Sequence, residues 1–120
     1  SGLKGLTYLD RVAKCVEGTE LGDTLRIAAE VDRIYQNSTG AVEILDPRLG
    51  RRIRIEKQGS ASTVVWNPWI GKSRLMPDFG DKEYQRMICV ESGNVGSSSF
   101  SLSPGAISTL TVKLSTETLK

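Results

Sequence analysis

Residues 41–56 constrain the fold of this 120-residue chain more than any other segment. In residues 41–45 Val42 and Ile44 lie on either side of the polar Glu43, and in residues 51–56 isoleucines alternate with charged residues. A period of two gives one apolar and one polar face, as in a half-buried β-strand. Between the two runs, Pro47 and Gly50 are typical of a tight turn. The segment therefore predicts a β-hairpin within an antiparallel sheet.

Further short apolar runs bounded by Gly, Pro, Asn or Ser predict more strands, at residues 6–12, 25–35, 63–66, 87–90 and 107–114. Loops are expected at residues 17–23, 58–62, 72–84 and 93–99, with a turn or two of helix at 81–85. Many short strands at roughly even spacing predict an all-β chain that forms an antiparallel β-sandwich. Its edges would be unpaired, so we expect another segment of the protein or a second subunit to cover them.

The composition is that of one globular domain, with 38% hydrophobic and 25% charged residues. A net charge of +2 gives no reason to expect a nucleic-acid partner. No apolar run approaches the ~18 residues of a membrane span, and no signal-peptide pattern is present. Cys15 and Cys89 are too few for a disulfide scaffold, and Cys89 is expected to be reduced and buried. A cytoplasmic location is expected, or an organelle such as the chloroplast stroma.

The chain contains no histidine, the residue most often used for acid–base catalysis and metal binding. Any catalysis must use carboxylates, lysine, tyrosine or cysteine, unless a histidine comes from outside these residues. The first residues, Ser1-Gly2-Leu3, lack a methionine. We expect the chain to be part of a longer protein.

Both tryptophans lie in residues 64–95, at Trp66 and Trp69, on either side of an Asn-Pro turn signal. Trp66 ends a strand and is expected to pack inward, whereas Trp69 follows the turn and is expected near a pocket. Glu91 follows the apolar run 87–90 and is expected at a strand end, where loops carry chemistry on a rigid scaffold. Aromatic rings beside a carboxylate are compatible with a sugar site.

Four motifs give the chain a family resemblance: Glu30-Val-Asp32-Arg33-Ile-Tyr35; Val64-Val-Trp66-Asn67-Pro68-Trp69 with Lys72; Asp78-Phe79-Gly80 with Tyr84; and Met87-Ile-Cys89-Val-Glu91 with Asn94-Val95. With Gly2–Asp10 and Leu102–Gly105, they cover nearly the whole chain. It resembles the hexose-6-phosphate mutarotases, the glucose-6-phosphate 1-epimerase branch of the aldose 1-epimerase, or galactose-mutarotase-like, superfamily.

The resemblance implies that residues 1–120 are the C-terminal portion of one large mutarotase-like β-sandwich. The implied reaction interconverts the α and β anomers of an aldohexose 6-phosphate, without a metal or an organic cofactor. By resemblance, Glu91 is the general base on the C1 hydroxyl. The implied substrate-binding residues are Asp32, Trp66, Asn67, Trp69 and Lys72. The family's acid, a histidine, and most of its phosphate-binding arginines are expected upstream of Ser1.

Several alternatives stay open at this level. Asp32 could instead form an ion pair with Arg33 or Lys14. Lys72 and Arg74 are either a solvated pair or phosphate ligands, and the arginines of residues 51–54 are either an exposed face or a partner surface. The chain could also be a non-catalytic carbohydrate-binding or scaffolding subunit, or an interaction domain whose Trp-Asn-Pro-Trp turn binds a protein.

Overall fold

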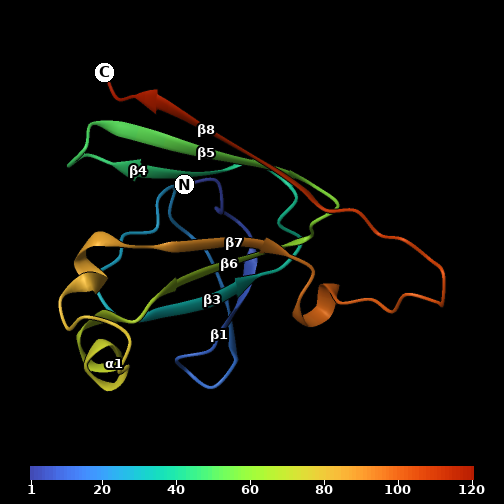
Figure 1. Ribbon diagram of the computed structural model, residues 1–120, viewed down its shortest axis with the longest axis horizontal. Coiled ribbons are helices and arrows are strands. Elements are labelled where there is room, and N and C mark those ends of the chain that lie inside the picture. Colours follow the sequence, from blue (N-terminus) through green and yellow to red (C-terminus); the bar gives the residue numbers. More distant parts are fainter.

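The computed structural model describes all residues, 1–120, and consists of two antiparallel sheets in separate layers (Figure 1). The five-stranded sheet has the order β2-β1-β3-β6-β7, and the three-stranded sheet has the order β4-β5-β8. The strands are β1 Thr7–Asp10, β2 Val16–Thr19, β3 Val31–Tyr35, β4 Val42–Asp46, β5 Arg51–Gln58, β6 Ser62–Asn67, β7 Cys89–Gly93 and β8 Thr111–Thr118. Helical segments are α1 Trp69–Leu75 and two 3-10 turns, η1 Glu83–Arg86 and η2 Gly96–Ser98. The predicted antiparallel β-sandwich is confirmed.

The hydrophobic core lies between the two layers. Val31 and Tyr35 of β3 and Val65 of β6 form one buried cluster with Val42 of β4 and with Leu3. Their neighbours in the strands face the other way because side chains alternate along a strand. Burying each large apolar side chain stabilises the fold by about 1.5–3 kcal/mol. The five-stranded sheet therefore has an inner face toward the core and an outer face away from it.

A polar network closes the inner face beside the core. The fully buried Tyr35 donates its hydroxyl hydrogen to Glu20 at 2.6 Å, and Arg33 pairs with the same carboxylate at 3.1 Å. The Arg33 guanidinium also lies 4.3 Å from the centre of the Tyr8 ring. Burial and the Glu20 carboxylate raise the pKa of Tyr35. These contacts tie β1, β3 and the segment after β2 together.

The hairpin prediction is confirmed as β4 and β5, which pair with Ile44 opposite Ile53. The arginines of β5 are half-exposed and paired rather than free. Arg51 contacts Asp46 at 3.0 Å, and Arg54 contacts Glu43 at 2.9 Å.

Three predictions on the N-terminal third differ from the structure. The strand β2, Val16–Thr19, overlaps the loop expected at 17–23. Gly18 lies in this strand and not in a turn, because the Tyr8 ring packs directly against it: a Cβ at Gly18 would lie 2.7 Å from Cζ of Tyr8. The expected strand at 25–35 is extended only from Val31, while Leu25 and Ile27 pack against the core as irregular chain. The strand expected at 6–12 ends at Asp10, whose carboxylate accepts hydrogen bonds from the Val12 and Ala13 amides.

The segment after Pro68 is a helix, α1, where a basic loop was expected. Asn67 accepts a hydrogen bond from the Trp69 amide at 2.9 Å, and the buried Ser73 donates to the Trp69 carbonyl. The helix ends at Leu75, and the next residue, Met76, has the extended backbone that is favoured before Pro77. The helical turn expected at 81–85 is found as η1.

The last two strands lie further along the chain than expected. Cys89–Gly93 replaces residues 87–90, and Thr111–Thr118 replaces residues 107–114. The loop expected at 93–99 contains the turn η2. Residues 99–110 form an arm that projects beyond the two sheets (orange to red in Figure 1). Apolar side chains of this arm and of β8 are exposed: Phe100, Leu102, Ile107, Leu110, Val112 and Leu114.

β8 pairs only with β5 and leaves its other edge free.

None of the helices has the length and hydropathy required to cross a membrane.

Candidate functional site

A cavity of about 300 Å³ opens on the outer face of the five-stranded sheet. Its lining combines two carboxylates, one guanidinium and an apolar floor: Asp32, Glu91, Arg11, Ile34, Val64, Trp66 and Val95. Asp32 and Ile34 alternate along β3 with residues of the inner face, as Val64 and Trp66 do along β6. The strands thus keep the core and the cavity on opposite sides of one sheet.

The strand order β3-β6-β7 brings the two carboxylates to this cavity. β6 is the middle strand of these three. Its Trp66 lies opposite Asp32 of β3, and its Val64 lies opposite Glu91 of β7. Because neighbouring strands are about 4.8 Å apart, the two carboxylates attach to strands separated by about 10 Å. The indole of Trp66 belongs to the strand between them. A sugar ring placed over β6 can therefore meet a carboxylate on each side.

The Asp32 carboxylate has unused hydrogen-bonding capacity. Its side chain is only 12% exposed, and no protein group donates a hydrogen bond to it; its nearest cation is Nε of Arg11, 3.7 Å from Oδ2. That distance is too long for a hydrogen bond. Buried carboxylates normally accept hydrogen bonds. Asp32 is thus ready to accept them from hydroxyl groups of a ligand.

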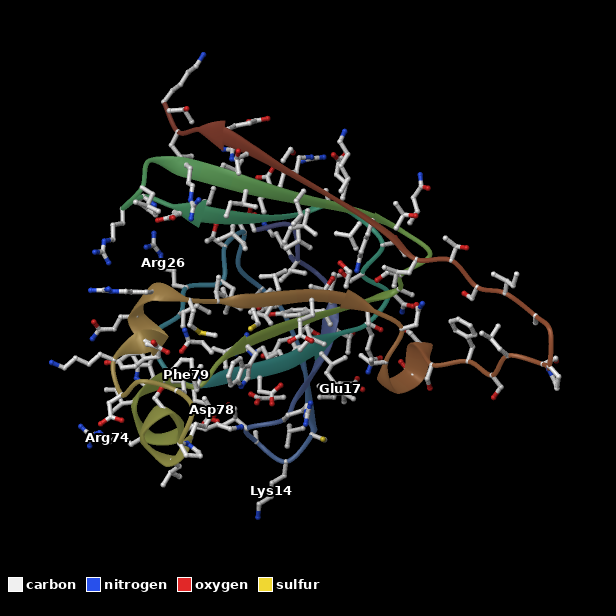
Figure 2. All side chains as sticks on the ribbon, viewed as in Figure 1. Lys14, Glu17, Arg26, Arg74, Asp78 and Phe79 are labelled. Atoms are coloured by element: carbon white, nitrogen blue, oxygen red, sulfur yellow. The ribbon has the colours of Figure 1, made fainter.

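The ion pair of Asp32 is made with neither of the two expected partners. Arg33 points to the inner face, where it pairs with Glu20. Lys14 projects into solvent from the turn between β1 and β2 (Figure 2). Arg11 takes this position because it directly follows β1 and its amide donates to the Asp32 carbonyl at 2.8 Å.

The Glu91 side chain is exposed and makes no ion pair or hydrogen bond. It lies in the middle of β7, not at the strand end that was expected, so its position is fixed by pairing on β6. Its charge acts on Cys89, two residues earlier on the same face. Burial, and then the Glu91 carboxylate, raise the pKa of the Cys89 thiol. Cys89 is free, as expected, but it is only partly buried.

Neither tryptophan takes the position that was expected of it. Trp66 lines the cavity, because its register with Asp32 places it on the outer face. Trp69 lies outside the cavity, and its ring packs edge-on against Tyr84 with centroids 5.1 Å apart. Its φ of 55° is left-handed, a conformation that the hydrogen bond to Asn67 supports. The turn directs the second ring away from the sheet.

The other expected substrate ligands are not at this cavity. Asn67 is 2% exposed and donates to the carbonyls of Tyr84 and Met87 at 2.9 and 3.0 Å, which holds the chain between α1 and β7. Lys72 lies on α1 with its Nζ 3.9 Å from Glu30. Arg74 points outward from the same helix (Figure 2).

Arg11 is the cavity residue that sequence reasoning missed. It is the only cation among the lining residues. The available signal was the pair Asp10-Arg11, where charge interrupts an otherwise apolar strand. No group of three or more His, Cys, Asp or Glu side chains is arranged to hold a metal ion.

Comparison with known proteins assigns the family. The family model of the aldose 1-epimerases matches residues 2–115, almost the whole chain. The chain belongs to the aldose 1-epimerase family. Enzymes of this family, the mutarotases, interconvert the anomers of sugars. The resemblance found in the sequence motifs is thereby confirmed.

Individual relatives agree with this assignment. The chain is 39% identical over 90 residues to a candidate glucose-6-phosphate 1-epimerase of Cenchrus ciliaris, covering 75% of this chain and 27% of the relative. A candidate enzyme of the same name from Haemophilus influenzae is 33% identical over 69 residues, with coverages of 58% and 24%. The crystal structure of YeaD, a candidate mutarotase from Salmonella typhimurium, superposes with a TM-score of 0.71 at 32% identity and covers 77% of this chain and 31% of that one. The chain thus spans about a quarter of the length of the curated relatives it matches.

Proposed function

We propose that the outer-face cavity takes part in interconverting the α and β anomers of an aldohexose 6-phosphate. The observation that carries this proposal is the convergence of Asp32, Trp66 and Glu91 on one cavity in a chain of the aldose 1-epimerase family. The names of the two curated relatives support the 6-phosphate as substrate. In this proposal the Trp66 indole packs against the sugar ring, and Asp32 accepts hydrogen bonds from its hydroxyl groups.

Glu91 acts as the general base. Its carboxylate removes the proton of the C1 hydroxyl, the C1 oxygen forms a carbonyl, and the bond between C1 and the ring oxygen breaks. The ring oxygen keeps that electron pair and takes a proton from a general acid. Rotation about the C1–C2 bond presents the other face of the aldehyde. Closure reverses both proton transfers and gives the other anomer.

The family resemblance implies that the general acid is a histidine. The chain has no histidine, so in this proposal the acid comes from polypeptide beyond these 120 residues. The surface offers room for such polypeptide: β8 has a free edge, and its neighbouring arm exposes Leu102 and Ile107. The additional polypeptide belongs to the same protein or to a second subunit. It covers this edge and completes the site, so residues 1–120 alone are inactive.

The phosphate group is held outside the cavity lining. The lining has one guanidinium against two carboxylates, a net negative charge that repels a phosphate. Arg11 is assigned instead to the sugar, as a donor to its hydroxyl groups and as the cation beside Asp32. Phosphate ligands are expected among arginines of the additional polypeptide.

A non-catalytic function is the second candidate, since a sugar can bind at the cavity of Asp32, Trp66 and Glu91 without a general acid. The cavity would then bind a sugar without converting it. Binding and turnover distinguish the two candidates: a carbohydrate-binding subunit quenches or shifts Trp66 fluorescence with glucose 6-phosphate but does not change the rate of anomer equilibration.

Polarimetry of freshly dissolved α-D-glucose 6-phosphate tests the catalytic role in the intact protein. Glu91→Gln is expected to lower the rate by a factor of about 10²–10⁴. Glu83→Gln is the matched control, because Glu83 is an exposed residue of η1 that lies outside the cavity. A Glu91→Gln protein as fast as the Glu83→Gln protein would remove Glu91 from the reaction.

A further inference from the structure

Lys57 carries a positive charge that the structure leaves without a counter-ion. It belongs to β5 and faces inward, like Ile53 and Ile55 before it. Its Nζ donates to the Ser62 carbonyl and to Oγ1 of Thr63, both at 2.8 Å. No carboxylate forms an ion pair with it. A charge withdrawn from water is normally paired, so this arrangement is unusual.

The surroundings of this ammonium group are buried and uncharged. Thr63 and Ser38 are 1% and 2% exposed, and their hydroxyls hydrogen-bond at 2.7 Å. Ser60 and Ser62 are buried as well, at 5% and 0%. Burial lowers the pKa of Lys57, because neutral oxygens replace water only in part. An anion beside the ammonium group would remove this penalty.

An open cavity of about 400 Å³ adjoins Lys57. Its lining contains no other charged residue: Thr39, Lys57, Gln58, Gly59, Ser60, Ala61, Asn94 and Phe100. The nearest charged neighbours along the strands, Glu56 and Lys113, alternate to the opposite face of the sheet and pair there at 3.8 Å. The cavity therefore presents a single, positive charge.

The loop that forms the wall of this cavity is held in place before any ligand binds. Oδ1 of Asn94 accepts a hydrogen bond from the Ala61 amide at 2.9 Å, and its Nδ2 donates to the Gly59 carbonyl at 2.7 Å. Gly59 has a φ of +74°, and a Cβ there would lie 2.2 Å from the Thr109 carbonyl oxygen. A rigid wall reduces the entropy lost on binding.

We propose that this cavity binds a small oxyanion, a phosphate or a carboxylate group, with Lys57 as its counter-ion. The ammonium group has three hydrogens, and its two hydrogen bonds within the protein leave one for the ligand. The hydroxyl of Thr39 and the amide of Gln58 line the same cavity and can donate to further ligand oxygens. The site shares no lining residue with the sugar cavity, so neither proposal depends on the other.

Titration of the full chain with inorganic phosphate, followed by NMR of the backbone amides, tests this site. Saturable shifts are expected at Gly59, Ser60 and Asn94, and sodium chloride at equal ionic strength should not reproduce them. Lys57→Gln should weaken binding about 10- to 100-fold, the range for a hydrogen bond to a charged group. Lys113→Gln is the matched control, since it removes an equal charge from the neighbouring strand, where the side chain is 75% exposed.

Acetate titrated in the same way distinguishes the two ligand classes, because stronger binding of phosphate or of acetate identifies the preferred oxyanion. A second measurement needs no variant: phosphate should raise the pKa of Lys57, read from its side-chain NMR signals. Shifts that do not saturate, that chloride reproduces, or that persist in Lys57→Gln would overturn the proposal. An unchanged pKa of Lys57 in phosphate would do the same.

Discussion

Replacing Asp32 by asparagine should weaken sugar binding far more than it weakens the fold. The only ionic contact of Asp32 is with Arg11 at 3.7 Å, and the Arg11 side chain is 54% exposed. Ion pairs of this kind contribute about 0–1 kcal/mol. The Asp32 carboxylate also accepts no hydrogen bond within the protein whose loss would add to this. The expected loss of stability is thus below about 1 kcal/mol, or roughly 4 °C in Tm.

The expected effect on binding is larger. A hydrogen bond from a sugar hydroxyl to a carboxylate contributes about 1.5–3 kcal/mol. Its loss in Asp32→Asn corresponds to a rise in KM of about 10- to 100-fold. Urea unfolding measures the stability, and polarimetry over a range of glucose 6-phosphate concentrations measures KM and kcat in the intact protein.

Asp23→Asn is the matched control for Asp32→Asn. Asp23 is a surface residue with its side chain 86% exposed, and it pairs with Lys4 at 2.8 Å. The control makes the same chemical change and also breaks an ion pair, but it should leave KM unaltered. A loss of more than about 2 kcal/mol of stability in Asp32→Asn, with KM unchanged, would contradict the argument and mark Asp32 as a structural residue.

Three further predictions concern the fold. Gly18→Ala places a Cβ 2.7 Å from Cζ of Tyr8 and should destabilise the protein by about 1–3 kcal/mol in urea unfolding; an unchanged midpoint would show that the Tyr8 ring moves freely. Gly71→Ala in α1 meets nothing within 4 Å and should stabilise by about 0.5–1 kcal/mol, whereas a loss would mean that α1 is not helical in solution. The pKa of Lys57 is lowered from 10.5 in the folded chain, so the unfolded chain binds more protons just below that pH and this residue makes stability rise with pH there. Urea unfolding between pH 8 and 10 should show this rise in the wild type relative to Lys57→Met, and identical slopes would refute it.

The sequence predicted those parts of the fold that depend on neighbouring residues along the chain. The hairpin of β4 and β5 follows from alternation over residues 41–56, and β6 from the apolar run before Pro68. β2 was missed because Gly18 suits a turn as well as it suits packing under Tyr8. The distinction depends on a ring from another strand, which no local pattern reveals.

The site could be predicted only in part, for the same reason. The residues singled out from the sequence include Asp32, Trp66 and Glu91, which line one cavity, but also Asn67, Trp69 and Lys72, which do not. The relative positions of the first three required the strand order β3-β6-β7, and the outward direction of Trp66 required the register of β6 on β3. Arg11 enters the cavity through pairing with β3, a contact between residues 21 positions apart in the chain.

The two faces of the five-stranded sheet have different freedom to vary. A substitution at Asp32 or Trp66 changes the cavity. The neighbours of these two residues along the strands face inward, where they are buried, as Val31 and Val65 are, or contact the Tyr35 hydroxyl, as Arg33 does. Ligand preference can therefore diverge among relatives, or be redesigned in the laboratory, one alternate position at a time. The packing that keeps the strands in register stays intact while this happens.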